Sequence, residues 1–343
     1  MNKIYKYIRK SYFYIFLIST LFPNWGFYAH KRINYYAIFT LKKANDGEML
    51  FSFFKKHIHY MVNRSIVPDI RKIYTKHEKE KHFINFENYG EEIIQQEYVS
   101  YNELINVYAY NVAKKLYPNV DEKELDQKIK TLISQSGINP WAISYSMEKL
   151  IKNFKEKNVK KILEESINLA HYIGDSCVVF HATANYDGQN TGQRGIHSLW
   201  ESTLPEYFFE EYNITEDIVP KAEYIENYKI IAWQNTIRSY LESKKALEIE
   251  RQLNEKVTLG KFCYKARGQN VKRMHSKNYA KEYHRRLNGQ VKQQIIKAIE
   301  LIGSFIYTAW VEAGKPNLIE ESSAKNYSTK IFTYIINIFS YIF

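Results

Sequence analysis

The chain has 343 residues, of which 45% are hydrophobic and 25% charged; this is globular composition and excludes a disordered, collagen-like or coiled-coil chain. Its 13 Gly and 7 Pro supply too few turns for an all-β sandwich or barrel, and 2 Cys exclude a disulfide scaffold. The net charge of +12 gives weak support to an anionic substrate, although abundant Lys, Ile, Asn and Tyr, the residues of AT-rich codons, account for it more simply.

The first 24 residues have the pattern of an export signal. A basic segment, Met1–Lys10, precedes an apolar run from Tyr12 to Phe22. The run is shorter than the roughly 20 residues that a membrane-spanning helix needs, which favours a cleaved signal over an anchor. We therefore expect a signal peptide at 1–24 and a mature protein that is secreted or periplasmic.

After Trp25, apolar residues recur at three- and four-residue spacing and predict an all-α fold, a multi-helix bundle with long connections. The expected helices are Glu97–Tyr117, Glu122–Ile133, Val159–His181, Asp217–Asn254 and Asn278–Ala313. Asp121, followed by Glu124, is typical of a helix start. Asn63–Asn88 and Asn185–Gly195 are polar and predict loops. We expect one domain at 25–316, followed by a tail at 317–343.

The most informative segment is His171-Tyr-Ile-Gly-Asp175-Ser-Cys-Val-Val-Phe-His181. At about 100° per residue, Asp175 lies about 40° from His171 and His181 about 80° to the other side, so one helix would present all three on one face. A second pair spaced by four, His197 and Glu201, follows. Imidazoles and carboxylates suit Zn²⁺. A single pair of this kind recurs by chance, but the doubled pattern favours a metal site.

Three upstream motifs complete the pattern: Trp25-Gly26-Phe-Tyr-Ala-His30, Pro68-Asp69 and His82-Phe-Ile. With them, the chain resembles the zinc-dependent phospholipase C / S1–P1 nuclease superfamily, which contains all-helical secreted phosphodiesterases with three zinc ions. The resemblance is to the bacterial phospholipase C-like branch and covers about Trp25 to Gly314. It extends to Tyr307–Gly314, which is similar to the closing core helix of those proteins.

The resemblance implies three zinc sites per chain. One zinc would be held by Asp69, His82 and His171, with Asp175 bridging it to another. A more open zinc would be held by His181, His197 and Glu201. The third would be held by His30, Asp175 and the backbone amine and carbonyl of Trp25. Asp69 would also orient or deprotonate the attacking water. Clustered zinc ions offset the charge of a phosphodiester and lower the pKa of bound water.

The third site requires Trp25 to be the first residue of the mature chain, because only a terminal amine has a lone pair for metal. Cleavage before Trp25 would leave Phe22 and Asn24 at positions where signal peptidases prefer small residues. The apolar run nevertheless ends just before this point, and Trp25 with His30 five residues on matches the superfamily's mature start. We expect cleavage at this bond.

The sequence departs from the family pattern at two positions. Val179 stands where relatives usually carry proline, which would let the helix continue to His181. Cys177 stands where bacterial relatives often carry histidine; a small buried residue is the simpler interpretation, a metal ligand the alternative. A disulfide between Cys177 and Cys263 is compatible with export, although no pattern shows that they are close.

The remaining histidines have simpler interpretations. His57 and His59 would lie solvated or half-buried on a basic helix face, and His77 is the competitor of His82 as a ligand. His275 and His284 belong to the basic segment Lys272–Arg286 and are expected at the surface. That segment is interpreted as a solvated helix face, with a phosphate-attracting patch as the alternative.

The substrate stays open between two classes. Glu201 and the short connection between His181 and His197 are similar to phospholipase C, whereas the Trp25–His30 spacing is similar to the nuclease branch. We favour phospholipase C-like hydrolysis, with single-strand nuclease activity as the alternative. A non-catalytic zinc-stabilised envelope protein is the second alternative. The apolar end of the tail, Ile331–Phe343, would pack on the domain or contact a membrane peripherally. No feature indicates an obligate protein partner.

Overall fold

The computed structural model describes residues 26–256, 260–267 and 270–318. The predicted signal peptide, Trp25 and the apolar end of the tail lie outside the described residues. The α-helices are α2 (Gly26–Lys42), α3 (Glu48–Lys56), α4 (Ile58–Arg64), α5 (Val67–Arg71), α6 (Tyr101–Glu103), α7 (Tyr110–Leu116), α8 (Glu122–Ser136), α9 (Asn139–Lys155), α10 (Val159–Ser176), α11 (Ile196–Ser198), α12 (Leu204–Phe208), α13 (Tyr228–Lys256), α14 (Lys277–Arg286) and α15 (Gln290–Glu312).

Shorter helical segments join these elements. The 3₁₀ turns are η1 (Lys79–His82), η2 (Phe86–Tyr89), η3 (Glu91–Gln95), η5 (Val179–His181) and η7 (Phe209–Tyr212), and the π-helical segments are η4 (Leu104–Ala109) and η6 (Leu199–Thr203). The strands β1 (Phe262–Arg267) and β2 (Asn270–His275) form one antiparallel hairpin. The prediction of an all-α fold is confirmed in that the described residues are mostly helical, but the hairpin was not predicted.

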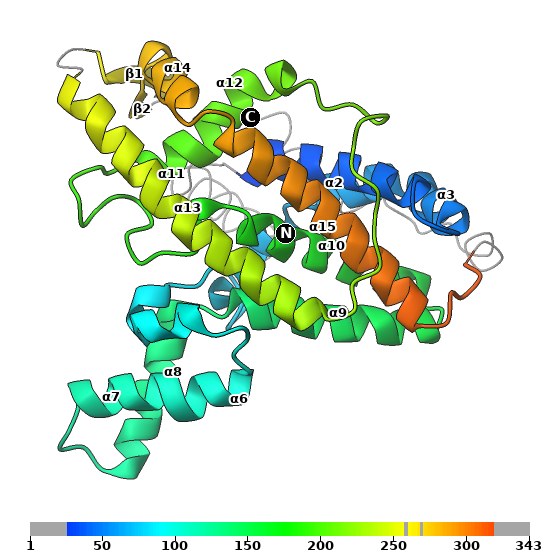
Figure 1. Cartoon of the computed structure of the whole chain (residues 1–343), viewed down its shortest axis with the longest axis horizontal. Helices are drawn as coiled ribbons and strands as arrows, with labels where there is room; N and C mark the ends of the chain where they lie inside the picture. Colours follow the sequence, from blue (N-terminus) through cyan, green and yellow to red (C-terminus); the bar gives the residue numbers. More distant parts are fainter. Residues whose placement is uncertain (1–25, 257–259, 268–269, 319–343) are drawn as a thin grey trace, which may run out of the picture.

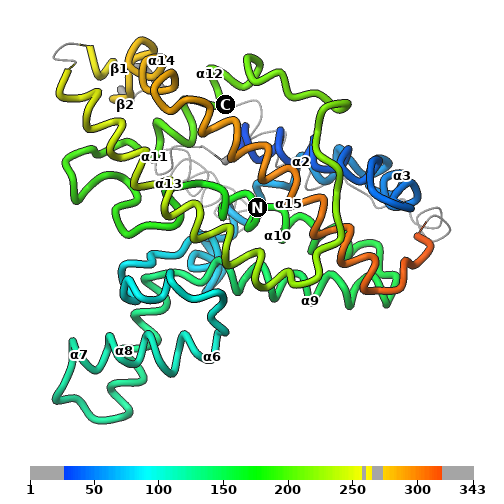
Figure 2. The backbone as a smooth tube through the Cα atoms, viewed as in Figure 1, coloured from blue at the N-terminus to red at the C-terminus, as the bar shows by residue number. Residues whose placement is uncertain are grey.

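The core is a bundle in which α15 packs against α2, α9 and α10, while α9 also packs on α10 and α13. The tube in Figure 2 shows α2, from the start of the described chain, running beside α15, from its end. The two helices approach closely at Gly303, where a Cβ would overlap Thr40. Helix α15 is long and apolar enough to cross a membrane, but 78% of its most apolar window is buried, as in the core helix of a bundle.

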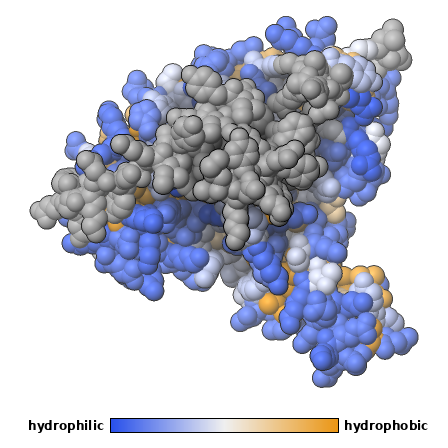
Figure 3. Space-filling model, turned by 180° about the vertical axis from the view of Figure 1, so that it is seen from behind, coloured by the Kyte–Doolittle hydropathy of each residue, from blue (hydrophilic) through white to orange (hydrophobic). Residues whose placement is uncertain are grey.

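Helices α6, α7 and α8 form an arm that extends from one end of the bundle (Figure 1). A second apolar cluster includes Leu104, Leu125 and Ile129 of the arm and continues to Trp141 of α9 and Trp233 of α13. Figure 3 shows apolar residues on the surface of this arm, where Val107 and Leu116 are exposed. The base of the arm is joined to η1, because the backbone N–H of Ile138 donates to the carbonyl of Glu80.

The helix boundaries correct several predictions. Helix α8 begins as expected, since Asp121 Oδ1 accepts a hydrogen bond from the Glu124 N–H at 2.8 Å. The predicted helix Asp217–Asn254 begins only at Tyr228, and Asn278–Ala313 is two helices because Asn288 and Gly289 both have positive φ. The predicted loop Asn63–Asn88 contains α5 and two 3₁₀ turns, whereas the loop prediction for Asn185–Gly195 is confirmed.

Candidate metal centre

Asp175 lies at the centre of a cluster of imidazoles at the end of α10. Its Oδ1 is 3.3 Å from His30 Nε2 and 3.4 Å from His181 Nδ1. Its Oδ2 is 2.8 Å from His82 Nδ1 and 3.3 Å from His171 Nε2. The carboxylate thus faces two histidines with each oxygen, and its contacts with His30 on one oxygen and with His82 and His171 on the other are the arrangement that a bridging ligand needs.

Asp69 and His82 approach the same point from α5 and η1. Asp69 Oδ1 is 3.4 Å from His171 Nε2 and 3.6 Å from His82 Nδ1. His82 is buried, whereas the side chain of His77 is 64% exposed and pairs with Glu80. The structure therefore brings His82, and not His77, into the cluster.

His30 enters the cluster from α2. It is buried, and its ring stacks on that of His171 with the centroids 4.1 Å apart. Gly174 makes this possible, because a Cβ at this position would lie 2.8 Å from His30 Cε1. Trp25, the other expected ligand of this site, lies outside the described residues.

His181, His197 and Glu201 form a second, more accessible group. His181 Nε2 lies 3.4 Å from Glu201 Oε2, and His197 Nε2 contacts the same oxygen. The side chains of His181 and His197 are 13% and 23% exposed, against 0% for His171 and 2% for Asp175. Glu201 lies in the π-helical segment η6, a type of distortion that is frequent at functional sites.

The prediction that His181 shares one helix with His171 and Asp175 is wrong. Helix α10 ends at Ser176, and Val178 is extended. The Ser176 carbonyl accepts hydrogen bonds from Asn235 and Ser239 of α13, which satisfy it in place of another helical turn. His181 reaches the cluster from the 3₁₀ turn η5 instead.

Backbone carbonyls orient two of the imidazoles. His171 Nδ1 is 2.7 Å from the Ser65 carbonyl, and His181 Nδ1 is 2.9 Å from the His82 carbonyl. A ring nitrogen beside a carbonyl carries the proton, so the Nε2 lone pair of each ring is directed into the cluster. This is the usual second hydrogen bond of a metal-binding histidine.

The carboxylates of the cluster are ionised although they are buried. Burial alone would raise the pKa of Asp175, but His171 and His181 outweigh it and bring the pKa well below its usual value. Burial likewise raises the pKa of Glu201, but His197 and His181 lower it to about 2. Buried negative charges require compensating positive charge, which protons or metal cations can provide.

Asp69 is ionised for a similar reason, with a different partner. Burial raises its pKa, but Lys72 and His171 lower it to well below its usual range. Burial lowers the pKa of His171, but Asp175 and Asp69 raise it to about 10. The ring is therefore protonated on both nitrogens and positively charged when no other cation is present. A divalent ion would take the place of such a proton.

Three sets of side chains meet the geometric requirement for a metal ion, with one ligand atom per residue and all ligand atoms of a set within 4.8 Å; two of the sets share His171, and the third shares no residue with them. The sets are His30, Asp69 and His171; His82, His171 and Asp175; and His181, His197 and Glu201. Eight of the nine predicted ligands therefore converge, and these buried groups could hold metal ions.

Two further residues were not predicted from the sequence. Lys72 Nζ lies 2.6 Å from Asp69 Oδ1; the three-residue spacing on a helix was the only sequence signal. Buried Glu78 has an Oε1 that lies 3.8 Å from His82 Nε2 and accepts hydrogen bonds from Arg71 and Tyr172. Glu78 thus contacts His82 on the ring nitrogen that faces away from the cluster and helps to orient this ring.

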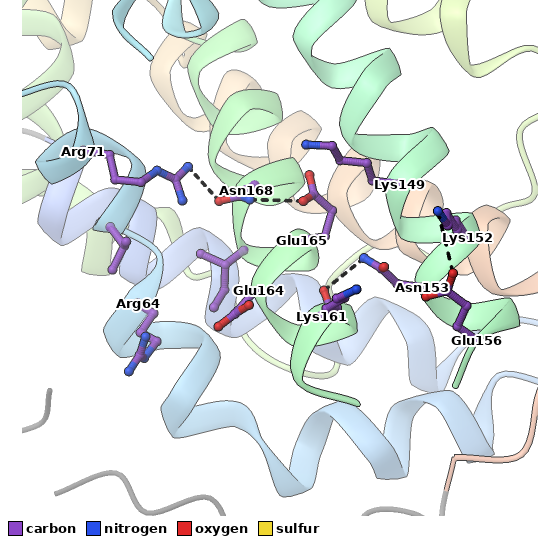
Figure 4. A pocket seen from close by; sticks show the side chains of 12 residues that line it. Arg64, Arg71, Lys149, Lys152, Asn153, Glu156, Lys161, Glu164, Glu165 and Asn168 are labelled. Carbon is purple, nitrogen blue, oxygen red and sulfur yellow. Dashed lines mark hydrogen bonds and ion pairs between the residues drawn. The ribbon is translucent and has the colours of Figure 1, made fainter. Parts of the chain in front are cut away.

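Arg71, which donates to Glu78, also lines a cavity of about 410 Å³ between α4–α5 and α9–α10 (Figure 4). Its guanidinium donates to Asn168 at 2.8 Å and to Glu78 at 2.7 Å. Lys149 and Lys161 line the cavity, as do Glu156, Glu164 and Glu165. None of the predicted ligands is among the lining residues.

The other histidines do not belong to the groups of described residues that could hold a metal ion. His57 is half-buried and His59 exposed, as expected. The surface prediction for His275 and His284 is wrong: His275 is buried, and His284 is half-buried with its ring stacked on Phe208.

Both cysteines are free. Cys177 is buried beside Asn235, in agreement with a packing role, and Cys263 is exposed on β1.

Neither a protein-family model nor a curated protein matches this sequence.

Proposed function

We propose that this chain is an exported phosphodiesterase of the zinc-dependent phospholipase C / S1–P1 nuclease type, with three zinc ions per chain. The observation that carries the proposal is the position of Asp175, which faces four histidines from separate segments with its two oxygens. Zinc ions bound there would offset the phosphodiester charge and activate water.

The side chains around the open group supply the other requirements of the reaction. Lys72 remains cationic, since Asp69 and Asp175 raise its pKa against the effect of burial. Its ammonium can donate to a phosphate oxygen beside the cluster. The low pKa of Asp69 makes its carboxylate a weak base, so we assign it to orienting the attacking water by accepting a hydrogen bond.

Unequal exposure argues against a purely structural metal centre. Structural zinc sites are closed, whereas catalytic sites keep a position open to water or substrate. His197 is 23% exposed and Asp69 20% exposed, while His171 is fully enclosed. We therefore place the reaction at the His181–His197–Glu201 group and Asp69, and assign a supporting role to the enclosed His30, His82, His171 and Asp175.

For the substrate we favour a phospholipid, with single-stranded nucleic acid as the second candidate. One observation supports the second: Tyr186 is 50% exposed, and its ring centroid lies 6.1 Å from that of His197. An aromatic ring at that place can stack on a base.

A side-by-side assay of the purified mature protein on phosphatidylcholine and single-stranded DNA tests the proposal. We expect chelator-sensitive hydrolysis of one substrate, restored by Zn²⁺. Hydrolysis of DNA alone would assign the chain to the nuclease class. If the protein hydrolyses neither substrate and also fails to hydrolyse a generic phosphodiester, an enzymatic function is contradicted.

A further inference from the structure

A second cavity, of about 280 Å³, lies between the β-hairpin and the loop that leads into α11. The hairpin side contributes Phe262, Arg273 and His275, and the loop side contributes Asp187, Arg194 and Ser198. His197 of the open group lies between Gly195 and Ser198, which both line this cavity. The cavity therefore borders the same turn of chain as the proposed reaction site.

Positive charge predominates among the lining residues. Neither Arg194 nor Arg273 forms an ion pair with a carboxylate in the part of the chain that the structure describes. The guanidinium of Arg273 lies over the Phe262 ring, 4.2 Å from its centroid. Asp187 is the one lining carboxylate, and its Oδ1 accepts a hydrogen bond from the Gly195 N–H at 3.0 Å. Two guanidinium groups beside one engaged carboxylate suit an anionic ligand.

His275 supplies an independent indication of a ligand. It is only 5% exposed, and its Nε2 is buried with no hydrogen-bond partner among the described residues. Its ring is held by Phe262, at 4.8 Å between centroids, and stacks on Tyr279 at 5.5 Å. A buried polar nitrogen without a partner is costly in a folded protein, and a bound polar ligand would remove that cost.

The walls of the cavity are held together by the fully buried Glu250 of α13. Its Oε1 accepts from Tyr279 at 2.6 Å and from Lys261 at 2.7 Å, and its Oε2 accepts from Gln193 at 2.7 Å. These partners come from α14, from the residue preceding β1 and from the loop before α11. A single buried carboxylate thus fixes the hairpin relative to the His197 loop, so the cavity is preorganised.

We propose that this cavity binds a second phosphate group of the substrate, distinct from the phosphodiester that is cleaved. Arg194 and Arg273 would hold its oxygens, and Ser198 and His275 would complete the hydrogen bonding. The inference rests on the proposed function, because it assigns the cavity to the same substrate. It favours substrates with more than one phosphate, either a nucleotide chain or a phosphorylated lipid headgroup.

Sulfate binding tests the anion site without any catalytic turnover. We would titrate the metal-loaded protein with sulfate and follow the ¹⁵N resonances of the His275 ring, assigned with a His275→Gln variant. Saturable shifts are expected, with an affinity at least about 10-fold weaker in Arg273→Gln and unchanged in Arg251→Gln, an exposed arginine of α13. Absence of any shift at His275 would overturn the proposal.

Paired substrates then identify the source of the second phosphate. One pair is the p-nitrophenyl ester of thymidine 3′-phosphate with and without a 5′-phosphate; the other is phosphatidylinositol with and without a 4-phosphate. In wild type the extra phosphate should lower KM in one pair. The ratio of KM without the extra phosphate to KM with it should fall to near one in Arg273→Gln and stay unchanged in Arg251→Gln. Equal KM values within every cleaved pair would overturn the substrate role. If no pair is cleaved, the proposed function fails and the sulfate titration still decides the anion site.

Discussion

The two parts of the cluster use the same kinds of side chain on different backbones. The buried part is built around α10, a regular helix whose His171 and Asp175 are almost completely enclosed. The open part is built on a 3₁₀ turn and a π-helical segment, and His197 is 23% exposed. Under the proposed function, the regular helix would fix the charge of the centre and the irregular segments would expose metal ligands to the substrate.

Removal of Asp175 should have the largest effect on this division, because all four neighbouring histidines face its carboxylate. We expect Asp175→Ala to lose more than one of three zinc ions. Its loss of activity should exceed the roughly 10–100-fold typical of residues behind the ligands. Elemental analysis measures the zinc content and phosphodiester turnover measures the activity, with Asp126→Ala on the exposed face of α8 as control. Retention of all metal would show that Asp175 does not bridge.

Replacement of Glu201 should separate the two parts. Its partners His181 and His197 belong to the open group, so Glu201→Ala should fold, lose at most one zinc and lose activity by orders of magnitude. Circular dichroism, metal content and turnover would be compared with Glu211→Ala, an exposed residue of η7. Turnover close to that of wild type would exclude Glu201 as a ligand of the catalytic ion.

A smaller effect is expected at the N-terminus. If the Trp25 amine completes the site of His30 and Asp175, one additional glycine before Trp25 should weaken the binding of one zinc ion and leave the other two ions bound. Mature protein that starts at Trp25 is the matched control, and N-terminal sequencing of exported material identifies the natural start. Full occupancy and activity from another start would show that this amine is not a ligand.

The smallest expected effect lies outside the cluster, at His275. Burial, reinforced by Lys261 and Arg273, lowers its pKa to about 4, against about 6.5 in an unfolded chain. Between these values the unfolded state binds the proton and the folded state does not, so stability should fall as the pH falls from 6.5 to 4. Urea unfolding of wild type and His275→Gln would be measured across this range, and the total loss of stability should be greater in wild type by up to about 3 kcal/mol. An identical pH dependence of stability in the two proteins would contradict a neutral buried ring.

The sequence predicted the local regularities of the site more reliably than its assembly. The four-residue spacings of His171–Asp175 and His197–Glu201 each place two side chains on one side of a helical segment, and this holds even in the π-helical segment. The end of α10 was missed because the Ser176 carbonyl is satisfied by Asn235 and Ser239 instead of by another helical turn. These two donors lie 59 and 63 residues further along the chain. Such tertiary hydrogen bonds leave no local pattern.

The hairpin and Lys72 were missed for different reasons. Phe262–Arg267 alternates only weakly, and its basic residues continue into the Lys/Arg-rich segment that was interpreted as a helix face. The burial of His275 follows from the pairing of that hairpin and its packing beside Gly195. Lys72 has an ordinary surface-lysine context in the sequence; its three-residue spacing from Asp69 indicates a local pair, and only the fold places that pair beside His171.

The zinc content of the purified mature protein tests the central claim most directly. Elemental analysis after removal of loosely bound metal should give close to three zinc ions per chain, because eight of the nine proposed ligands lie together and four of them, all histidines, face Asp175. A value of one or less in wild-type protein that is folded and saturated with zinc during purification would contradict the trinuclear centre.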